Sequence, residues 1–163
     1  MMTLQKRTTL TYIIAIGGTL ALGGLSALLT GDAMARYGQY VQPPLAPPGW
    51  LFPVVWTVLY ALMGLSAAMA YLDAGESRRD VVRVYCLQLA LNLAWPILFF
   101  RFQLLLAAFV WLVVLEAVIA VMLALFYAVK RVAGLLQIPY FLWVAFAGYL
   151  NLATYILNPT PLP

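Results

Sequence analysis

Five long stretches of apolar residues dominate this chain and constrain its fold more than any other feature. Charged residues, glycine or proline bound the stretches, which cover residues 10–29, 51–72, 81–100, 104–129 and 132–157. A helix that crosses the ~30 Å hydrocarbon core of a bilayer needs about 20 residues. We therefore expect an all-α integral membrane protein, a bundle with one transmembrane helix for each stretch.

The composition agrees with a protein that is solvated by lipid. Of the 163 residues, 66% are hydrophobic and only 9% are charged, whereas soluble domains contain roughly 25% charged residues. Five crossings with short connections use nearly the whole chain, so we expect a single membrane domain over residues 1–163. The apolar run at residues 8–30 is longer than the core of a signal peptide, and we interpret it as the first transmembrane helix.

The residue types exclude or disfavour several classes of function. The chain has no histidine and one cysteine, so an intrachain disulfide is excluded and a zinc site or a His-ligated haem is not expected. We predict no metal site and no required cofactor. Without histidine, paired carboxylates or a Gly-rich phosphate loop, a conventional enzyme is not expected either. The lone Cys86 is interpreted as a packing residue rather than a reactive thiol.

The distribution of positive charge predicts an orientation in the membrane. Loops rich in Lys and Arg stay on the cytoplasmic side. Seven such residues fall on one side of the predicted bundle: Lys6, Arg7, Arg78, Arg79, Arg83, Lys130 and Arg131. Arg36 and Arg101 fall on the other side. We therefore expect a cytoplasmic N-terminus, with the proline-rich connection at residues 30–49 outside. The charges form no basic stripe, so no nucleic-acid partner is expected.

Small residues recur at every fourth position of the first stretch: Ala15, Thr19, Gly23 and Ala27. Rows of small residues let two helix backbones approach closely in lipid. The row is compatible with the interface of a homodimer and with close packing inside one chain, and the sequence leaves both interpretations open.

Aromatic residues occupy one face of the second stretch. Phe52, Trp56 and Tyr60 follow one another at a spacing of four, which places them on the same side of a helix. An aromatic face in lipid can serve packing or form the wall of a binding site. Trp50 fits an interfacial aromatic belt and is also a candidate ligand contact. Trp56 lies deeper and is the better candidate for a binding wall.

Two further faces combine aromatic rings with carboxamides. They comprise Gln88, Asn92, Trp95 and Phe99 in the third stretch, and Tyr140, Trp143, Ala147 and Asn151 in the fifth. Carboxamides inside a span usually point into the bundle, because hydrocarbon offers them no hydrogen-bond partner. Asn92 is thus either an interhelical hydrogen-bonding group or a polar contact to a ligand. Three such faces predict an apolar pocket with a few polar contacts, which is typical of small-molecule sites.

Two single residues in the spans stand out. Pro96 is predicted to interrupt the hydrogen bonds of the third helix and to kink it. Glu116 is the one charged residue well inside a span, which makes it a candidate functional residue. A carboxyl group without a basic partner can also simply be protonated, and no chain of titratable groups indicates a proton relay.

The motifs on the three aromatic faces resemble those of one known family. Residues 47–64 read Pro-Pro-Gly-Trp-x-Phe-Pro-x-x-Trp-x-x-Leu-Tyr-x-x-Met-Gly, and residues 139–151 read Pro-Tyr-x-x-Trp-x-x-Phe-Ala-x-x-Leu-Asn. Between them lies Gln-x-x-x-Asn-x-x-Trp at residues 88–95, followed by Phe99 and Phe100. These motifs are similar to the second, fifth and third helices of the TspO/MBR family of tryptophan-rich sensory proteins and translocator proteins. That family is also called peripheral-type benzodiazepine receptors.

The resemblance implies a five-helix bundle, often dimeric, in a bacterial cell membrane. It implies a pocket beneath the first connection that takes porphyrin, haem or synthetic ligands. Trp56 and Trp143 match tryptophans implicated in light-dependent porphyrin breakdown and would be the catalytic residues of that reaction. Pocket positions are matched by Tyr60, Asn92, Trp95 and Ala147.

Some residues depart from the family pattern. Leu45 stands where a tryptophan is usual, and Gln42 replaces the usual lysine, so we expect the connection to bind an anionic porphyrin differently. No cation follows Tyr155, so sterol binding through the C-terminal motif of animal members is not expected.

Three functions remain in view at this stage. The leading hypothesis is a membrane receptor or sensor for tetrapyrroles, with a role in tetrapyrrole homeostasis or stress response. The alternatives are photochemical porphyrin degradation and tetrapyrrole transport, although five helices without an internal repeat do not suggest alternating access. A bundle whose aromatic residues serve only packing is the simplest alternative.

Overall fold

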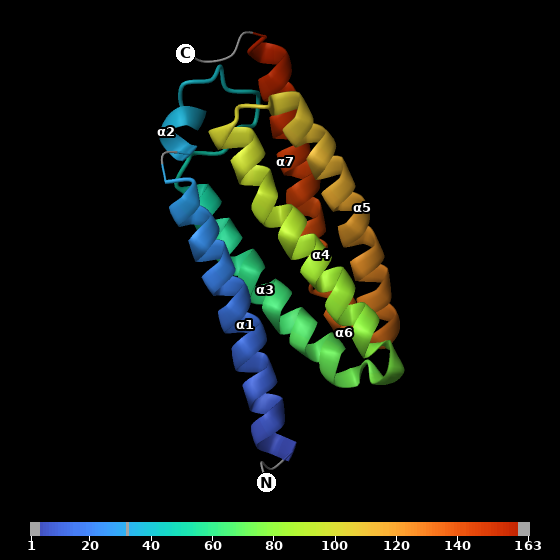
Figure 1. Ribbon diagram of the computed structural model, residues 1–163. Helices are drawn as coiled ribbons and strands as arrows, with labels where there is room; N and C mark the ends of the chain where they lie inside the picture. The colour runs from blue at the N-terminus through green and yellow to red at the C-terminus, as the bar shows by residue number, and fades with distance from the viewer. Residues whose placement is uncertain (1–3, 32, 160–163) are drawn as a thin grey trace.

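The protein is a bundle of helices, as a computed structural model of residues 4–31 and 33–159 describes it. Five helical segments are long and apolar enough to cross a membrane: Leu4–Leu29, Leu51–Asp73, Gly75–Arg101, Leu105–Val129 and Arg131–Leu157. They run side by side along one axis, and the first begins at the end of the bundle opposite to the one where the last finishes (Figure 1). The prediction of an all-α membrane bundle with five spans is confirmed.

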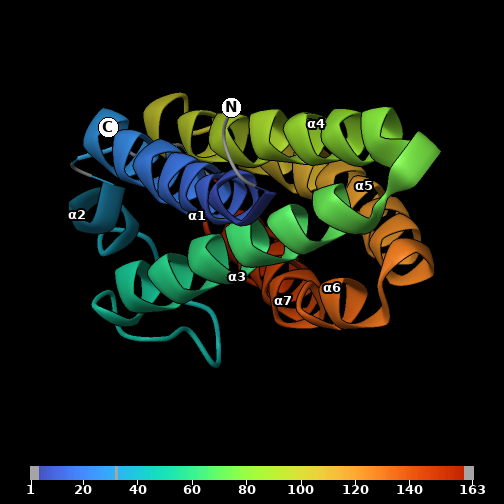
Figure 2. The same cartoon turned by 90° about the horizontal axis from the view of Figure 1, so that it is seen from below.

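The five spans differ in regularity. Helices α1 (Leu4–Leu29), α3 (Leu51–Asp73) and α5 (Leu105–Val129) are continuous. The third span consists of the 3₁₀ helix η1 (Gly75–Ser77), α4 (Arg78–Pro96) and the π-helix η2 (Ile97–Arg101). The fifth consists of α6 (Arg131–Leu135) and α7 (Ile138–Leu157), and α2 (Ala33–Tyr37) lies in the first connection. Seen along the bundle, α1 lies between α3 and α4, and α5 lies on the side away from α2 (Figure 2).

The small residues of α1 pack against the same chain. Thr19 and Gly23 are buried, and the hydroxyl groups of Thr19 and Tyr85 form a hydrogen bond. A Cβ atom at Gly64 would lie 2.6 Å from the Cα atom of Ile16, so α1 and α3 are in backbone contact there. The assignment of Thr19 and Gly23 to a dimer interface is therefore wrong, because neither is accessible to a second copy.

The other two members of that row are more accessible, since Ala15 is half-buried and Ala27 is exposed. A Cβ atom at Gly64 would lie 2.7 Å from the carbonyl oxygen of Ala15, and Ala27 lines an internal cavity. The row thus explains how α1 and α3 approach within one chain, as expected for small residues in lipid. A homodimer stays a prediction, and within the row only Ala15 and Ala27 are accessible to a second copy.

The predicted kink at Pro96 takes the form of a wide helical turn. Proline lacks the N–H that would continue the α-helical pattern, and the next residues form π-type bonds, such as Phe102 N–H to the Ile97 carbonyl at 3.0 Å. Both phenylalanines of this turn, Phe99 and Phe100, are buried. The wide turn therefore brings two aromatic rings into the bundle beside α4.

The first connection forms a lid over one end of the bundle, comprising α2 and residues 38–50. Asn158 at the end of α7 holds it in place: its Oδ1 accepts from the Val41 N–H at 2.8 Å, and its Nδ2 donates to the Val41 carbonyl at 3.2 Å. The Tyr149 hydroxyl donates to the Pro44 carbonyl at 2.9 Å. Gln42 donates to the carbonyls of Tyr37 and Tyr40.

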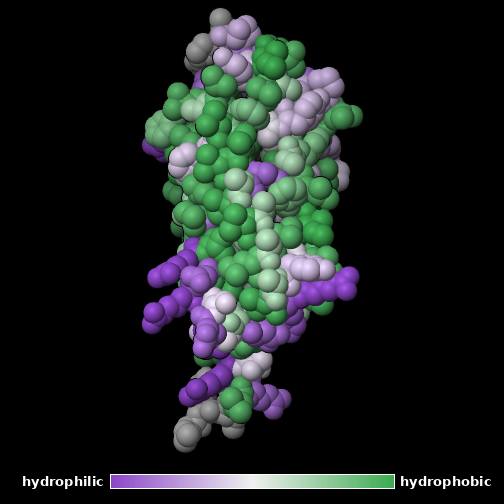
Figure 3. Space-filling model, turned by 90° about the vertical axis from the view of Figure 1, so that its right-hand side faces the viewer, coloured by the Kyte–Doolittle hydropathy of each residue, from purple (hydrophilic) through white to green (hydrophobic). Residues whose placement is uncertain are grey.

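The opposite end of the bundle carries most of the charge. The flank seen in Figure 3 is largely hydrophobic, and its strongly hydrophilic residues gather towards the lower end, where α1 begins. At this end the Lys130 ammonium lies 2.8 Å from the Asp73 carboxylate, which links the end of α3 to the end of α5. A hydrophobic flank with charge at one end is the surface expected of a protein embedded in a bilayer.

Candidate functional site

A cavity of about 280 Å³ lies inside the bundle beneath the lid, among α1, α3, α4 and α7. Its size is near the lower end of the ~300–1,000 Å³ typical of small-molecule sites. Eight of the residues predicted to bind a ligand line it: Phe52, Trp56, Tyr60, Asn92, Trp95, Phe99, Ala147 and Asn151. The three predicted faces therefore converge on one space.

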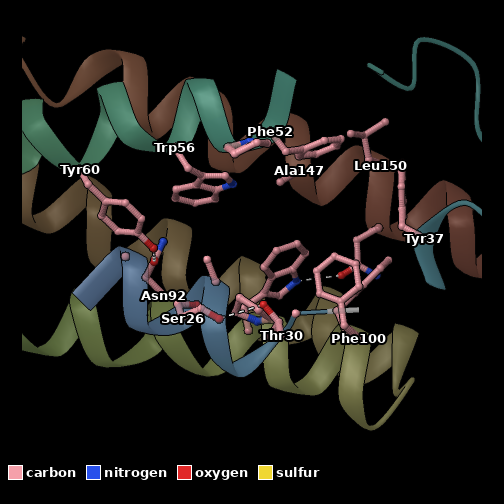
Figure 4. Close-up of a pocket in the computed structure, with 18 residues that line it drawn as sticks. Ser26, Thr30, Tyr37, Phe52, Trp56, Tyr60, Asn92, Phe100, Ala147 and Leu150 are labelled. Carbon is pink, nitrogen blue, oxygen red and sulfur yellow. Dashed lines mark hydrogen bonds between the residues drawn. The ribbon is translucent and has the colours of Figure 1, made fainter. Parts of the chain in front are cut away.

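Aromatic rings make up most of the wall. Trp56 projects from α3 into the space across from Ser26 and Asn92 (Figure 4). Its ring centroid lies 5.4 Å from that of Tyr60, and the centroids of Trp95 and Phe99 are also 5.4 Å apart. Aromatic faces at these separations make contacts with each other and present flat apolar surface to any ligand.

Asn92 joins three helices through hydrogen bonds at the inner end of the cavity. Its Oδ1 accepts from the Tyr60 hydroxyl at 2.7 Å, and its Nδ2 donates to the Tyr140 hydroxyl at 3.0 Å. The Tyr140 hydroxyl in turn donates to Gln88 Oε1 at 3.0 Å. The interhelical role that the sequence allowed for Asn92 is thus present, and a polar contact from Asn92 to a ligand stays a prediction.

Asn151 fixes the position of one aromatic wall residue. Its Oδ1 accepts from the Trp95 Nε1–H at 3.2 Å, and its Nδ2 donates to the Leu105 carbonyl at 2.8 Å. Both ends of the carboxamide are therefore engaged. Asn151 acts by holding the indole of Trp95 across the gap between α7 and α4.

Two predicted ligand contacts do not line the cavity. Trp50 precedes α3 and is 67% exposed, as expected of an interfacial tryptophan. Trp143 packs behind Phe52, with ring centroids 6.0 Å apart, and also contacts Phe146. The structure therefore does not place a ligand directly between Trp56 and Trp143, because Phe52 stands between Trp143 and the space.

The lid contributes a polar side chain to the cavity. Tyr37 lines it and is buried. Burial raises the pKa of the Tyr37 phenol, and the Thr154 hydroxyl opposes this to a smaller extent. Burial also raises the pKa of Tyr40, against the charge of Arg36. Both phenols therefore remain protonated donors at neutral pH. The Arg36 guanidinium donates to the Phe100 carbonyl at 3.3 Å.

Ten lining residues were not among the predicted contacts: Gly23, Ser26, Ala27, Thr30, Gly31, Tyr37, Pro53, Pro96, Phe100 and Leu150. Half of them come from α1 and the two residues after it, where the row of small residues was interpreted as a homodimer interface or as close packing inside one chain. Small residues also leave room for a cavity, and that signal was available. The position of Tyr37 depends on how the lid folds back, which no periodicity in the sequence reports.

The arrangement suits the binding of a flat apolar molecule. Within residues 4–31 and 33–159, no group of three or more His, Cys, Asp or Glu side chains could hold a metal ion. Hydroxyl groups of Ser26, Thr30 and Tyr37 line the cavity, the Tyr60 hydroxyl and the Asn92 carboxamide are bonded to each other at its inner end, and indole and phenyl rings make up most of the remaining wall. A ligand with a flat apolar body and a polar edge directed towards the lid would match this distribution.

Comparison with known proteins gives concordant matches. The sequence profile of the TspO/MBR family matches residues 14–157. The chain is 40% identical over 159 residues to the tryptophan-rich protein TspO of Chlorobaculum tepidum, covering 95% of this chain and all of that one. It is 37% identical to the protein CrtK of Rhodobacter capsulatus over 131 residues, which is 79% of this chain and 82% of CrtK. It is 36% identical to the translocator protein of Bos taurus over 147 residues, 86% and 87% of the two chains.

Proposed function

The chain belongs to the TspO/MBR family, and from that premise we propose that it is a membrane receptor or sensor that binds porphyrin- or haem-type tetrapyrroles in the cavity beneath the lid. The observation that carries the proposal is the convergence of Trp56, Trp95 and Phe99 on one apolar space. Tetrapyrroles are flat aromatic molecules, and rings of this kind stack on indole and phenyl faces. Such a receptor serves tetrapyrrole homeostasis or a stress response.

In this proposal the ligand stacks on Trp56 from one side only. Trp143 contributes indirectly, because its indole supports Phe52. The carboxylate edge of the tetrapyrrole points towards the lid, where Tyr37 supplies a protonated phenol and Arg36 a positive charge. A carboxylate is favoured near a guanidinium and hydroxyl donors, since both can donate hydrogen bonds to it.

The test is a titration of the purified full-length protein with protoporphyrin, followed by quenching of tryptophan fluorescence and by the Soret band. We expect saturable binding that Trp56→Phe weakens about tenfold and Trp143→Phe weakens less. Trp50→Phe is the matched control, because Trp50 is exposed outside the cavity. The proposal fails if binding does not saturate, or if Trp56→Phe and Trp50→Phe titrate alike.

Light-dependent porphyrin degradation is a second candidate, favoured by the position of Trp56 in the cavity with Tyr60 at a ring distance of 5.4 Å. Light absorbed by the bound porphyrin supplies the energy, and dioxygen is the oxidant. Trp56 would be the catalytic residue, and Trp143 would be a positioning residue that acts through Phe52. The complex is illuminated under air while the Soret band is followed. Equal bleaching in the wild type and in the variant with both Trp56→Phe and Trp143→Phe would exclude a role of these indoles.

A further inference from the structure

A second cavity lies on the outside of the bundle, in the seam between α5 and α7. It measures about 310 Å³, and its lining includes Phe109, Glu116, Ala117, Phe141, Ala145 and Gly148. None of these residues lines the cavity beneath the lid. Val113 and Tyr149, which also line it, are 54% and 41% exposed. The cavity therefore opens on the flank of the protein that faces lipid, and we call it the α5–α7 groove.

Small residues create the groove. Ala117 and Ala120 on α5 face Ala145 and Gly148 on α7. No atom lies within 4 Å of the place where a Cβ atom at Gly148 would stand. The two helices are close elsewhere, since the Asn151 side chain reaches the Leu105 carbonyl at 2.8 Å. The seam is thus closed near the lid and hollow further down.

The groove holds a carboxyl group that has no partner. Both oxygens of Glu116 are buried and make no hydrogen bond within the described chain. Glu116 lies eleven residues after Leu105 and thirteen before Val129, so it sits near the middle of the bilayer. The nearby Tyr140 hydroxyl is already engaged with Asn92 and Gln88. A buried polar group without a partner is costly, and an ionisable residue inside a span points to a function.

We propose that the α5–α7 groove binds a membrane-dissolved amphiphilic amine, whose nitrogen meets the carboxyl group of Glu116 when that side chain turns into the groove, and whose apolar body fills the space over the small residues. Two unpartnered oxygens call for a ligand with at least two donors, which a primary amine has and an alcohol lacks. The rings of Phe109 and Phe141 line the same groove, and aromatic faces favour a cationic nitrogen.

A second copy of the chain is a poorer occupant. Within the described spans, Lys and Arg lie at or near helix ends, such as Arg83 early in α4 and Arg101 at the end of η2. The carboxamides at mid-depth are turned inwards: Gln88, Asn92 and Asn151 are all 3% exposed or less. A partner chain would therefore bring no ammonium, guanidinium or carboxamide group to Glu116 at mid-depth.

The experiment uses the full-length protein in lipid nanodiscs and a dodecylamine that carries a photoreactive diazirine in its chain. After illumination, labelled peptides are identified by mass spectrometry, and unmodified dodecylamine and dodecanol are compared as competitors. We expect saturable labelling of α5 and α7 peptides that contain groove residues. Dodecylamine should compete at least tenfold better than dodecanol.

Three variants separate the possible causes. Glu116→Gln keeps the shape and removes the acid, and it should weaken labelling of the groove at least tenfold. Gly148→Leu fills the groove, where a side chain meets no obstacle, and should also abolish labelling. Val121→Ala is the control, since Val121 is 62% exposed on α5 and does not line the groove. Protoporphyrin binding beneath the lid should be unchanged in all three, so this proposal and the proposed function fail independently.

Several outcomes would overturn the proposal. If Glu116→Gln leaves the labelling unchanged, or if amine and alcohol compete equally, the groove binds amphiphiles only as any lipid-facing surface does. A crosslinked dimer through α5 and α7, lost in Gly148→Leu, would identify a second copy as the occupant instead. Labelling that does not saturate would show partition of the amine into lipid only.

Discussion

Asn92 and Tyr140 are the residues at which α3, α4 and α7 are joined by hydrogen bonds in the middle of the bundle. Tyr140 is completely buried, and Asn92 is 3% exposed. The two differ in one respect that matters for function, because Asn92 lines the cavity beneath the lid and Tyr140 does not. Stability and ligand binding can therefore be separated at this network.

We predict that Tyr140→Phe lowers the free energy of unfolding by about 1–3 kcal/mol, because it leaves Asn92 Nδ2 and Gln88 Oε1 buried without a partner. Protoporphyrin affinity should change less than threefold. Thermal unfolding in detergent measures the first effect, and a porphyrin titration measures the second. Tyr155→Phe is the control, since Tyr155 is 39% exposed. Equal stability of the two variants would contradict the assigned role of the Tyr140 hydroxyl.

The contact between α1 and α3 depends on single glycines. We predict that Gly64→Ala destabilises the protein by about 1–3 kcal/mol, because the new Cβ would overlap the backbone of Ile16 and force the helices apart. Gly17→Ala in α1 is the matched control. No atom surrounds its Cβ position, so alanine should be neutral or should stabilise the helix by up to about 1 kcal/mol. Thermal unfolding of both variants measures the difference, and similar losses would exclude the close contact as the cause.

At the scale of elements, the lid depends on the end of α7. Asn158 forms two hydrogen bonds with Val41, one with its N–H and one with its carbonyl, and a third with the Thr154 carbonyl at 2.8 Å. A single side chain thus ties the lid to the C-terminal end of the last span. Tyr149 reinforces this through the Pro44 carbonyl.

We predict that Asn158→Ala loosens the lid without unfolding the bundle. Two hydrogen bonds of ~0.5–1.5 kcal/mol each are lost, so the Val41 amide should exchange its hydrogen roughly 5- to 100-fold faster. Hydrogen exchange followed by mass spectrometry on lid peptides measures this. Gln39→Ala, a change at an exposed lid residue, should leave exchange as in the wild type. Faster exchange throughout the spans would mean that the variant destabilises the whole bundle.

The sequence predicted the spans well because length and apolarity are what a bilayer selects. It predicted an interruption of α-helical bonding at Pro96 but not the π-turn that follows, and it did not predict the break between α6 and α7. Those features depend on neighbouring helices that supply partners, as when the Ser66 hydroxyl donates to the Ala133 carbonyl at 2.7 Å. The lid helix α2 is only five residues long, which is too short for a periodic signal.

The site could be predicted in part because helical periodicity fixes which residues share a face. Periodicity also placed Trp143 on the face that lines the cavity, and the structure does not, for a geometric reason. Each step of four residues rotates ~40° around a helix with 3.6 residues per turn, so Trp143 and Asn151 point about 80° apart. The neighbouring Phe52 takes the place next to the cavity. Which edge of a broad face reaches a cavity depends on the rotation of the helix, and the sequence does not report it.

At the scale of the whole molecule, the two ends of the bundle differ in kind. One end holds the lid with its tyrosines and the C-terminal end of α7. The other end holds the start of α1, the η1 turn and the Asp73–Lys130 pair (Figure 1). Seven of the nine Lys and Arg residues belong to the second end. Positive charge near the ends of spans is retained on the cytoplasmic side, so the lid and the cavity beneath it should open away from the cytoplasm.

This orientation predicts how cysteines in the loops respond to a membrane-impermeant maleimide. In a Cys86→Ser background, Ala46→Cys in the lid should react in intact cells, whereas Glu76→Cys in η1 should react only after the membrane is permeabilised. Ala46 lies in the lid and Glu76 in the short η1 turn at the start of the third span, outside the long helices of the bundle, so the substitutions should not disturb it. The parent Cys86→Ser protein should remain unlabelled. Labelling of Glu76→Cys but not Ala46→Cys in intact cells would show that the protein has the opposite orientation in the membrane. A tetrapyrrole would then enter the cavity from the cytoplasm. Labelling of both in intact cells would indicate two orientations, which a seven-to-two charge asymmetry should not permit.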